Sequence, residues 1–293
     1  MNQKKLVMGT RASKLALWQA DHVRAQLALR WGCQAEIKKI TTKGDLIQDR
    51  SLSQIGGKGL FLKEIEDELL SGTIDFAVHS MKDVPYDMPE NLELAAILKR
   101  ADPSDALVSR NNIPIQALPK GAVIGTSSLR RMVQLKNKFP HLVFKDLRGN
   151  VDTRLKKLDD GLYDAVVLAS AGLMRLGLSD RISQRLDIVS SVGQGAMGIE
   201  CCSGRPDLVR LLQGIEDNAT AAAVHLERCY SRMIKGTCQT PMGCLVRADT
   251  ADSQRFVLKC FKANPDGSDY FEKEISGAWC DGEKLVKEML GVC

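Results

Sequence analysis

The chain has 293 residues, of which 44% are hydrophobic and 26% charged, a balance typical of a protein that buries a full core rather than of a disordered or low-complexity chain. Lys and Arg outnumber Asp and Glu by only 41 to 36, which argues against a protein that coats nucleic acid. Aromatic residues make up 5%, so stacking platforms for single-stranded nucleic acid are poorly supplied.

Short apolar runs alternate with amphipathic segments along the first two thirds of the chain. Ser13 is placed to cap a first helix, and Gly32 lies just beyond its end. Further helices are predicted at 60–70, 127–135, 150–158 and 170–176. Strands are predicted at 6–10, 35–41, 75–80, 92–98, 105–109, 122–126, 143–147 and 165–169. This alternation predicts an α/β fold with mainly parallel sheets.

The pattern changes after residue 195. A long helix is predicted at 219–234, and two strands at 255–262 and 269–276 flank the turn signal at 264–267. A last helix is predicted at 282–290. This tail is typical of a small, separate α+β domain.

Nine cysteines are present, with no CxxC pair, and the four histidines are scattered, so no zinc site is expected. Free thiols in a reducing cytoplasm are the expectation. Neither a signal peptide nor a stretch approaching the roughly 18 apolar residues of a membrane span is found. We therefore expect a cytoplasmic protein that binds neither a metal nor a membrane.

Arginines recur where predicted strands give way to helices. A helix N-terminus repels cations unless an anion is also bound there, and the carboxyl ends of strands are where open α/β sheets bind ligands. Nearby hydroxyls and backbone N–H groups would complete an anion site. The alternative, a solvated side chain or a pair with an Asp, is equally expected for any single arginine. The set predicts a polyanion site formed by Arg11, Ser13, Thr126, Ser127, Ser128, Arg130, Arg131, Arg148, Arg154 and Arg175.

Two further residues could carry chemistry. Asp83 follows a predicted strand, and a carboxylate there could stabilise a cationic intermediate or move a proton, although a salt bridge to an arginine is the simpler reading. Cys238 lies in a Gly- and Pro-containing turn where a thiolate could attach a group covalently. The local pattern does not choose between Cys238 and Cys244.

Several motifs resemble those of one family. The runs are RASKLA at 11–16, GKGLF at 57–61, AVHSMKDVP at 77–85, GTSSLRR at 125–131, RGNVDTRL at 148–155, VGQGA at 192–196 and KGTCQTPMGC at 235–244. In this order they resemble the porphobilinogen deaminase (hydroxymethylbilane synthase) family. The resemblance implies a transferase that joins four porphobilinogen molecules head to tail, with loss of ammonia, to give hydroxymethylbilane for tetrapyrrole and heme biosynthesis.

The resemblance also implies roles for individual residues. A dipyrromethane cofactor is expected on Cys238 through a thioether, with Asp83 as the catalytic carboxylate. Substrate carboxylates are expected on Arg11, Ser13 and Arg175. The positions expected to hold the cofactor are Lys82, Asp83, Thr126, Ser127, Ser128, Arg130, Arg131, Arg148, Gly149 and Arg154. Each pyrrole unit carries an acetate and a propionate, so the growing chain is a polyanion.

The fold implied by the resemblance has two α/β domains similar to periplasmic binding proteins and a small C-terminal α+β domain. The expected boundaries are 1–98 with 199–217 for the first, 99–198 for the second and 218–293 for the third. A monomer without nucleic-acid or membrane partners is expected. Two other classes compete with this reading: a non-enzymatic binding protein for a small anion, and a nucleic-acid binder, which would need more aromatic residues.

Overall fold

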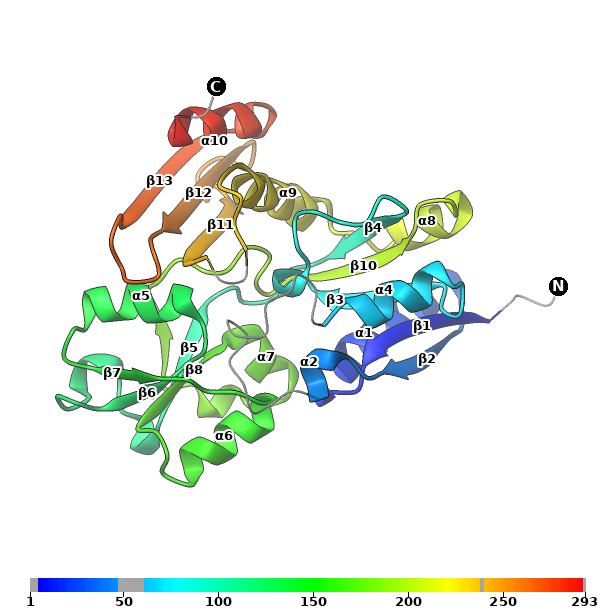
Figure 1. Ribbon diagram of the computed structural model, residues 1–293. Helices are drawn as coiled ribbons and strands as arrows, with labels where there is room; N and C mark the ends of the chain where they lie inside the picture. The colour runs from blue at the N-terminus through cyan, green and yellow to red at the C-terminus, as the bar shows by residue number, and fades with distance from the viewer. Residues whose placement is uncertain (1–4, 47–60, 238–239, 292–293) are drawn as a thin grey trace.

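The structure is a computed structural model that describes residues 5–46, 61–237 and 240–291. Within these ranges the strands form three sheets, two of five strands and one of three. Figure 1 shows the first sheet on the right, the second at the lower left and the third above the second. Among the described residues, no helix combines the length and the apolar character required to cross a bilayer.

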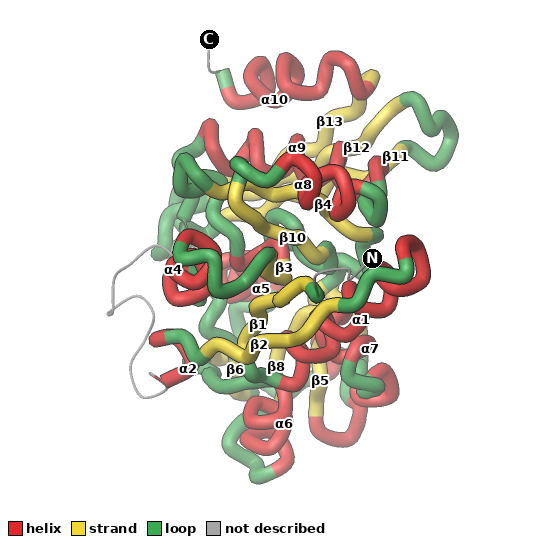
Figure 2. Tube along the Cα trace, turned by 90° about the vertical axis from the view of Figure 1, so that its right-hand side faces the viewer, coloured by secondary structure: helices red, strands yellow, loops and turns green. Residues whose placement is uncertain are grey.

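The first sheet combines four strands from residues 6–98 with one strand from residues 197–202. Its strands lie in the order β2 (Ala35–Ile40), β1 (Leu6–Arg11), β3 (Phe76–Ser80), β10 (Met197–Cys202) and β4 (Leu92–Leu98). The strand β1 runs parallel to β2 and β3, whereas β10 is antiparallel to β3 and β4. Figure 2 shows β10 inserted between β3 and β4.

Helices bury both faces of this sheet. Apolar side chains of α1 (Lys14–Trp31) and α8 (Pro206–Gln213) pack on one face, and those of α4 (Lys63–Leu70) pack on the other. A short helix, α2 (Lys43–Leu46), follows β2. Ser13 accepts a hydrogen bond from the Ala16 N–H, and Gly32 ends α1 at φ 62°, so both predicted helix signals are confirmed.

The second sheet repeats the arrangement of the first. Its order is β7 (Val143–Lys145), β6 (Val123–Gly125), β8 (Ala165–Ala169), β5 (Asp105–Ser109) and β9 (Gln184–Leu186). The strand β6 is parallel to β7 and β8, and β5 is antiparallel to β8 and β9. One face is covered by α5 (Leu129–Lys138), and the other by α6 (Val151–Asp159) and α7 (Ser170–Arg175).

The third sheet is antiparallel and lies at the C-terminal end of the chain. It contains β11 (Met242–Ala248), β12 (Arg255–Lys262) and β13 (Phe271–Ala278), and it packs on α9 (Asn218–Met233) and α10 (Gly282–Leu290). The short 3-10 helices are η1 (Met81–Asp83), η2 (Arg110–Asn112), η3 (Ile115–Ala117), η4 (Ser179–Arg181) and η5 (Trp279–Asp281).

The predicted α/β class, with two larger α/β parts and a small C-terminal α+β part, is confirmed. The expectation of mainly parallel sheets is wrong, because β5 and β10 each enter a five-stranded sheet in the antiparallel sense and make half of its pairings antiparallel. Three strands, β9, β10 and β11, were not predicted.

Candidate active site

A cavity of about 570 Å³ lies between the first and second sheets. Its lining includes the residues that follow β1 and β3 on one side and those that follow β6, β7 and β8 on the other. These are the carboxyl ends of the strands, where α/β sheets bind ligands. From the predicted site, the lining takes Arg11, Ser13, Lys82, Asp83, Ser127, Arg131, Arg148, Gly149 and Arg154.

Lys82 and Asp83 lie in η1, the turn directly after β3. Asp83 is exposed to the cavity, and neither side chain forms a hydrogen bond or ion pair with any residue that the structure describes. Burial, with a smaller effect of Arg131, lowers the pKa of Lys82 to about 8 even though Asp83 opposes the shift. A cation and a carboxylate thus face the cavity without protein partners in the described chain.

The turn after β7 adds two more cations. The Nε–H of Arg154 donates to the Gly149 carbonyl oxygen at 2.7 Å. Gly149 has φ +108°, a conformation that side-chain-bearing residues rarely adopt. Burial, together with Arg131, lowers the pKa of Arg154 to about 10. The Nε of Arg148 is buried without a hydrogen-bond acceptor in the described chain, and Asp146 Oδ2 lies 3.7 Å from it. An added carboxylate ligand would satisfy such a group.

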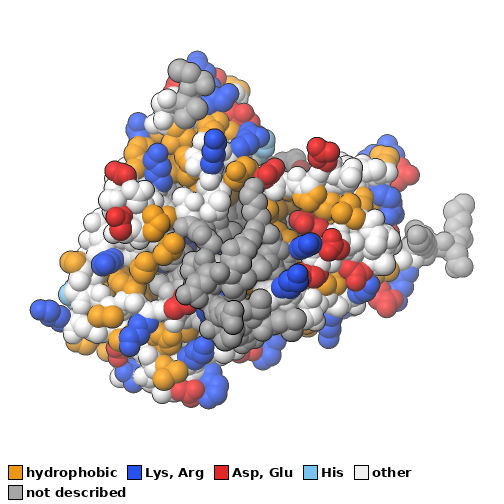
Figure 3. Space-filling model, viewed as in Figure 1, with side chains coloured by type: hydrophobic (Ala, Val, Ile, Leu, Met, Phe, Trp, Pro, Cys, Tyr) orange, Lys and Arg blue, Asp and Glu red, His pale blue; other side chains and the backbone are white. Residues whose placement is uncertain are grey.

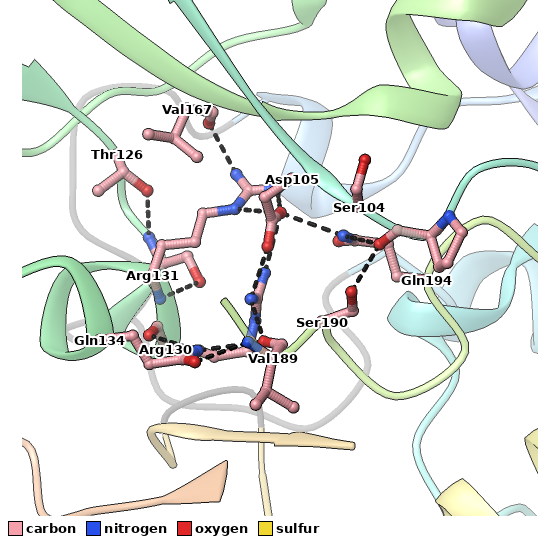
Figure 4. Close-up of polar contacts among 12 residues, drawn as sticks. Ser104, Asp105, Thr126, Arg130, Arg131, Gln134, Val167, Val189, Ser190 and Gln194 are labelled. Carbon is pink, nitrogen blue, oxygen red and sulfur yellow. Dashed lines mark hydrogen bonds and ion pairs between the residues drawn. The ribbon is translucent and has the colours of Figure 1, made fainter. Parts of the chain in front are cut away.

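Arg130 and Arg131, in contrast, converge on one buried carboxylate (Figure 4). Asp105 is fully buried and accepts from Arg130 Nη1 at 2.7 Å and from Arg131 Nε at 2.8 Å. Gln194 Nε2 donates to the same carboxylate at 3.1 Å. Burial alone would raise the pKa of Asp105, but the two guanidinium groups hold it well below its usual range.

Each of these two arginines also donates to a backbone carbonyl. Arg130 Nη1 also donates to the Val189 carbonyl at 2.6 Å, and Arg131 Nη1 donates to the Val167 carbonyl at 2.7 Å. Arg131 lines the cavity, whereas Arg130 lies behind it, toward the third sheet. Both side chains are therefore held within the protein.

The three hydroxyl residues after β6 shape the start of α5. Ser128 caps the helix by accepting from the Arg131 N–H, and Thr126 Oγ1 accepts from the Ser128 N–H at 3.2 Å. Ser127 Oγ donates to the Leu147 carbonyl at 2.6 Å, which ties this turn to the one after β7. Of the three, Ser127 lines the cavity.

Of the three residues expected to bind substrate, two line the cavity and one lies beside it. Arg11 lines the cavity, contacts Asp45 through Nη2 and Oδ1 at 2.5 Å, and lies over the Phe61 ring at 4.1 Å. Ser13 lines the cavity at the start of α1. Arg175 donates through Nη2 to the Gly195 carbonyl at 2.7 Å, over the Trp18 ring and beside the cavity rather than in its lining. Burial lowers the pKa of Arg175 to about 10.

The sequence did not predict a role for some residues that line or support the cavity. Asp105 was placed in a strand without a role, although a charged residue at the head of an apolar strand signals a buried partner. Asp45 and the pair of Gln19 Nε2 with Ser80 Oγ, at 2.9 Å, also line or support the cavity. The predicted attachment residue, Cys238, and the glycine-rich run at 57–60 lie outside the described residues.

Among the residues that the structure describes, no group of three or more His, Cys, Asp or Glu side chains could hold a metal ion. On the face shown in Figure 3, Lys and Arg side chains are interspersed with Asp and Glu rather than gathered in one patch. The fold and the cavity therefore define a two-lobed α/β protein with a cavity between its lobes that several cationic side chains line.

Comparison with known proteins identifies the family. The family described as "Porphobilinogen deaminase, dipyromethane cofactor binding domain" matches residues 6–210. The chain is 48% identical over 295 residues to the porphobilinogen deaminase of Bordetella parapertussis, covering 98% of this chain and 93% of the relative. It is 49% identical over 272 residues to that of Neisseria meningitidis serogroup A, covering 92% and 86%. The chain belongs to the porphobilinogen deaminase family.

Solved structures that align with this chain share less of its sequence than these relatives do. The methionine binding protein MetQ aligns with a TM-score of 0.49 and 12% identity, covering 76% of this chain and 94% of that one.

Proposed function

We propose that the cavity carries out the reaction of porphobilinogen deaminases, the head-to-tail condensation of four porphobilinogen molecules into hydroxymethylbilane with loss of ammonia. Family membership over nearly the whole chain supports this function. The observation that carries it is the set of cations that face the cavity without a carboxylate partner in the described chain: Lys82 and Arg154, with the buried Arg148 Nε beside them. Such a site suits a ligand with several carboxylates.

The donor set fits a dipyrromethane cofactor. Its carboxylates would find Arg148 and Arg154, with Ser127 as a further donor, on one wall of the cavity and Lys82 on the other. Arg131 joins them only if one of its bonds to Asp105 or Val167 is exchanged. When bound, the dipyrromethane supplies the pyrrole position to which the first substrate is joined. Thr126, Ser128 and Gly149 contribute by shaping the two turns that present these groups.

We propose that the cofactor is attached through a thioether to Cys238. The alternative, Cys244, lies in β11 with no exposed surface, and burial raises its thiol pKa far above the ordinary value. A buried thiol that resists ionisation is a poor attachment point. Cys238 follows α9 in the stretch that precedes β11.

Asp83 is proposed as the catalytic carboxylate. Loss of ammonia leaves positive charge on the substrate, and an exposed carboxylate without a protein partner in the described chain can stabilise that charge and accept hydrogen bonds from pyrrole N–H groups. Asp83 opposes the lowering of the Lys82 and Arg154 pKa values by burial, so these two cations partly balance its negative charge.

Arg11 and Ser13 are proposed to bind the carboxylates of the incoming porphobilinogen, since both line the cavity. For Arg11 this requires that its ion pair with Asp45 is shared or exchanged for the substrate carboxylate. Arg175 can join them if its hydrogen bond to the Gly195 carbonyl is exchanged for a carboxylate. Arg130 contacts cofactor carboxylates only if its bonds to Asp105 and Val189 are exchanged in the same way.

We also propose the domain division 1–98 with 199–217, 99–198 and 218–293, which is supported by the return of β10 to the first sheet. A monomeric, cytoplasmic enzyme is part of the same proposal. The seven cysteines in the described ranges are free thiols, as a reducing compartment favours.

Attachment is tested by the intact mass of the purified protein. We expect a mass above the 32.2 kDa of the bare chain by one dipyrromethane, together with a positive Ehrlich reaction for pyrroles. Cys238→Ala should lose the added mass, whereas the matched control Cys244→Ala should keep it. An adduct that persists in Cys238→Ala would assign the attachment elsewhere.

The role of Asp83 is tested by Asp83→Ala. Because the carboxylate acts on charge that develops during the reaction, turnover should fall by about 10²-fold or more while the cofactor mass is retained. The exposed Glu90→Ala in the same segment serves as a control with unchanged turnover. Turnover near the unsubstituted level in Asp83→Ala would remove this residue from the mechanism.

A further inference from the structure

Arg228 lies in α9, the helix that packs on the third sheet. Its side chain reaches the chain segment that directly follows Asp83. Its guanidinium donates to three consecutive carbonyl oxygens: Nη1 to Val84 at 3.1 Å, and Nη2 to Pro85 at 2.8 Å and to Tyr86 at 3.4 Å. The side chain is half-buried. A charged side chain that converges on three neighbouring carbonyls fixes the path of that segment.

The preceding residue of α9 holds the other end of the same turn. Glu227 is fully buried and accepts from the Gly193 N–H at 2.7 Å. Gly193, at φ +67°, packs so closely on η1 that an added Cβ would lie 2.7 Å from Met81 Cβ. Nearby, the Ala196 carbonyl accepts from the Met81 N–H at 3.1 Å. Two consecutive residues of one helix therefore hold the turn on both sides of Lys82 and Asp83.

The turn depends on these backbone contacts, because the side chains of Lys82 and Asp83 form no hydrogen bond or ion pair within the described chain. Arg228 donates to each of the three carbonyls after Asp83, and the Val84 N–H donates to the Met81 carbonyl. Pro85 has no N–H and cannot extend a strand ladder through this segment. The direction in which Asp83 enters the cavity thus follows from where Arg228 holds the chain.

Arginine suits this position better than lysine. Its planar fork reaches several acceptors at once, whereas an ammonium group is a single point. Burial, with a further effect of Arg232, lowers the pKa of Arg228, and Glu200 opposes this shift. Glu200 itself contacts His79 Nε2 at 2.8 Å in the adjoining strands β10 and β3. A guanidinium group remains charged in such surroundings.

We propose that Arg228 is a positioning residue for Asp83, and that it makes α9, the helix leading to the attachment stretch, part of the active site. The proposal rests on the catalytic role proposed for Asp83. Arg228 touches neither the cavity nor its ligands and acts through the backbone at 84–86.

The test compares steady-state kinetics of Arg228→Met with those of the matched control Arg232→Met, an exposed arginine one turn further along α9. In the loaded enzyme we expect Arg228→Met to lower kcat about 10- to 100-fold, as a displacement of about 1 Å at a reacting group does, with KM for porphobilinogen changed less than about threefold. Arg228→Lys should recover part of the loss. Arg232→Met should leave both parameters unchanged.

A double-variant cycle separates positioning from a general structural role. If Arg228 acts through Asp83, adding Arg228→Met to Asp83→Ala should lower the residual turnover by less than about twofold. The same factor in both backgrounds, or a raised KM with unchanged kcat, would overturn the proposal. If circular dichroism shows Arg228→Met to be unfolded, the cycle is run with Arg228→Lys and the same two outcomes apply.

Failure of the proposed function and failure of the positioning role give different kinetic results. The former appears as near-normal turnover in the single variant Asp83→Ala, whatever Arg228→Met does. Failure of the positioning role appears as normal kcat in Arg228→Met while Asp83→Ala is inactive.

Discussion

Two groups of cations occupy corresponding places in the second sheet, and they behave differently. Arg130 and Arg131 follow β6 and share the buried carboxylate of Asp105. Arg148 and Arg154 follow β7, and neither contacts a carboxylate closer than the 3.7 Å between Arg148 and Asp146 in the described chain. An arginine between a strand and a helix does not by itself mark a ligand site. An arginine is available to a ligand when no buried carboxylate lies within hydrogen-bond distance of it.

The two groups should therefore respond in opposite ways to substitution. The group at Asp105 is complete within the protein, so removing its carboxylate leaves buried charges unpaired. Arg154 is buried without a carboxylate partner in the described chain, so an anionic ligand would stabilise its charge. Stability and ligand binding are thus assigned to different arginines.

The largest effect is expected from Asp105→Asn. Two buried guanidinium groups would lose their shared carboxylate, and we expect the free energy of unfolding to fall by about 3–5 kcal/mol. Urea unfolding followed by circular dichroism measures the loss. Asp187→Asn, whose side chain is 90% exposed, is the control and should change stability by less than about 0.5 kcal/mol. A loss below about 1 kcal/mol for Asp105→Asn would erase the contrast between the two groups.

An intermediate effect, on binding and not on stability, is expected from Arg154→Met. Charge-assisted hydrogen bonds contribute about 1.5–3 kcal/mol each, so loading of the cofactor should weaken by about 10-fold or more while unfolding in urea is unchanged or shifted to higher denaturant. Intact mass gives the loaded fraction. The control is Lys156→Met, an exposed lysine on the same helix. Equal loading in both variants would contradict a ligand-directed role for Arg154.

The smallest effect concerns pH. In the folded protein without its cofactor, the pKa of Lys82 lies at about 8, below its ordinary value of 10.5, so the unfolded chain binds more protons between these values. Stability contributed by this residue should accordingly rise as pH increases from about 8 to 10.5. Solvent screening limits the rise to roughly 1 kcal/mol. Lys82→Met should abolish it, and the exposed Lys99→Met should not. Identical pH profiles for Lys82→Met and the unsubstituted chain would show that Lys82 is not desolvated.

Local pattern was sufficient where a strand is a continuous apolar run between polar turns. The predicted strands at 92–98, 105–109, 165–169 and 255–262 have the bounds found in the structure. The strand β10 was missed because Glu200 interrupts its apolar pattern, and this glutamate is tolerated only because it meets His79 from a strand more than a hundred residues away. Antiparallel insertion of such a strand depends on distant partners that a local pattern does not contain.

The residues of the site were likewise predicted where the local pattern was sufficient, and their long-range contacts were not. The arginines and Asp83 were found from their positions after strands, and most of them line the cavity. Their separation into paired and unpaired groups was not predicted, because Asp105 lies 25 residues before Arg130 in the chain and their contact exists only in the folded sheet. Arg228 gave no sequence signal, since its acceptors are backbone carbonyls, which every residue carries.

The interleaving of the first sheet has a consequence for synthesis of the chain. The second sheet takes all its strands from 105–186, so it can be completed once Leu186 has left the ribosome. The first sheet begins with the earliest residues but lacks its fourth strand until Cys202 has emerged, and until then β3 and β4 expose unpaired edges that can associate with other chains. The middle of this polypeptide can therefore mature before its beginning, and a nascent chain stalled before Met197 carries a finished lobe joined to an open one.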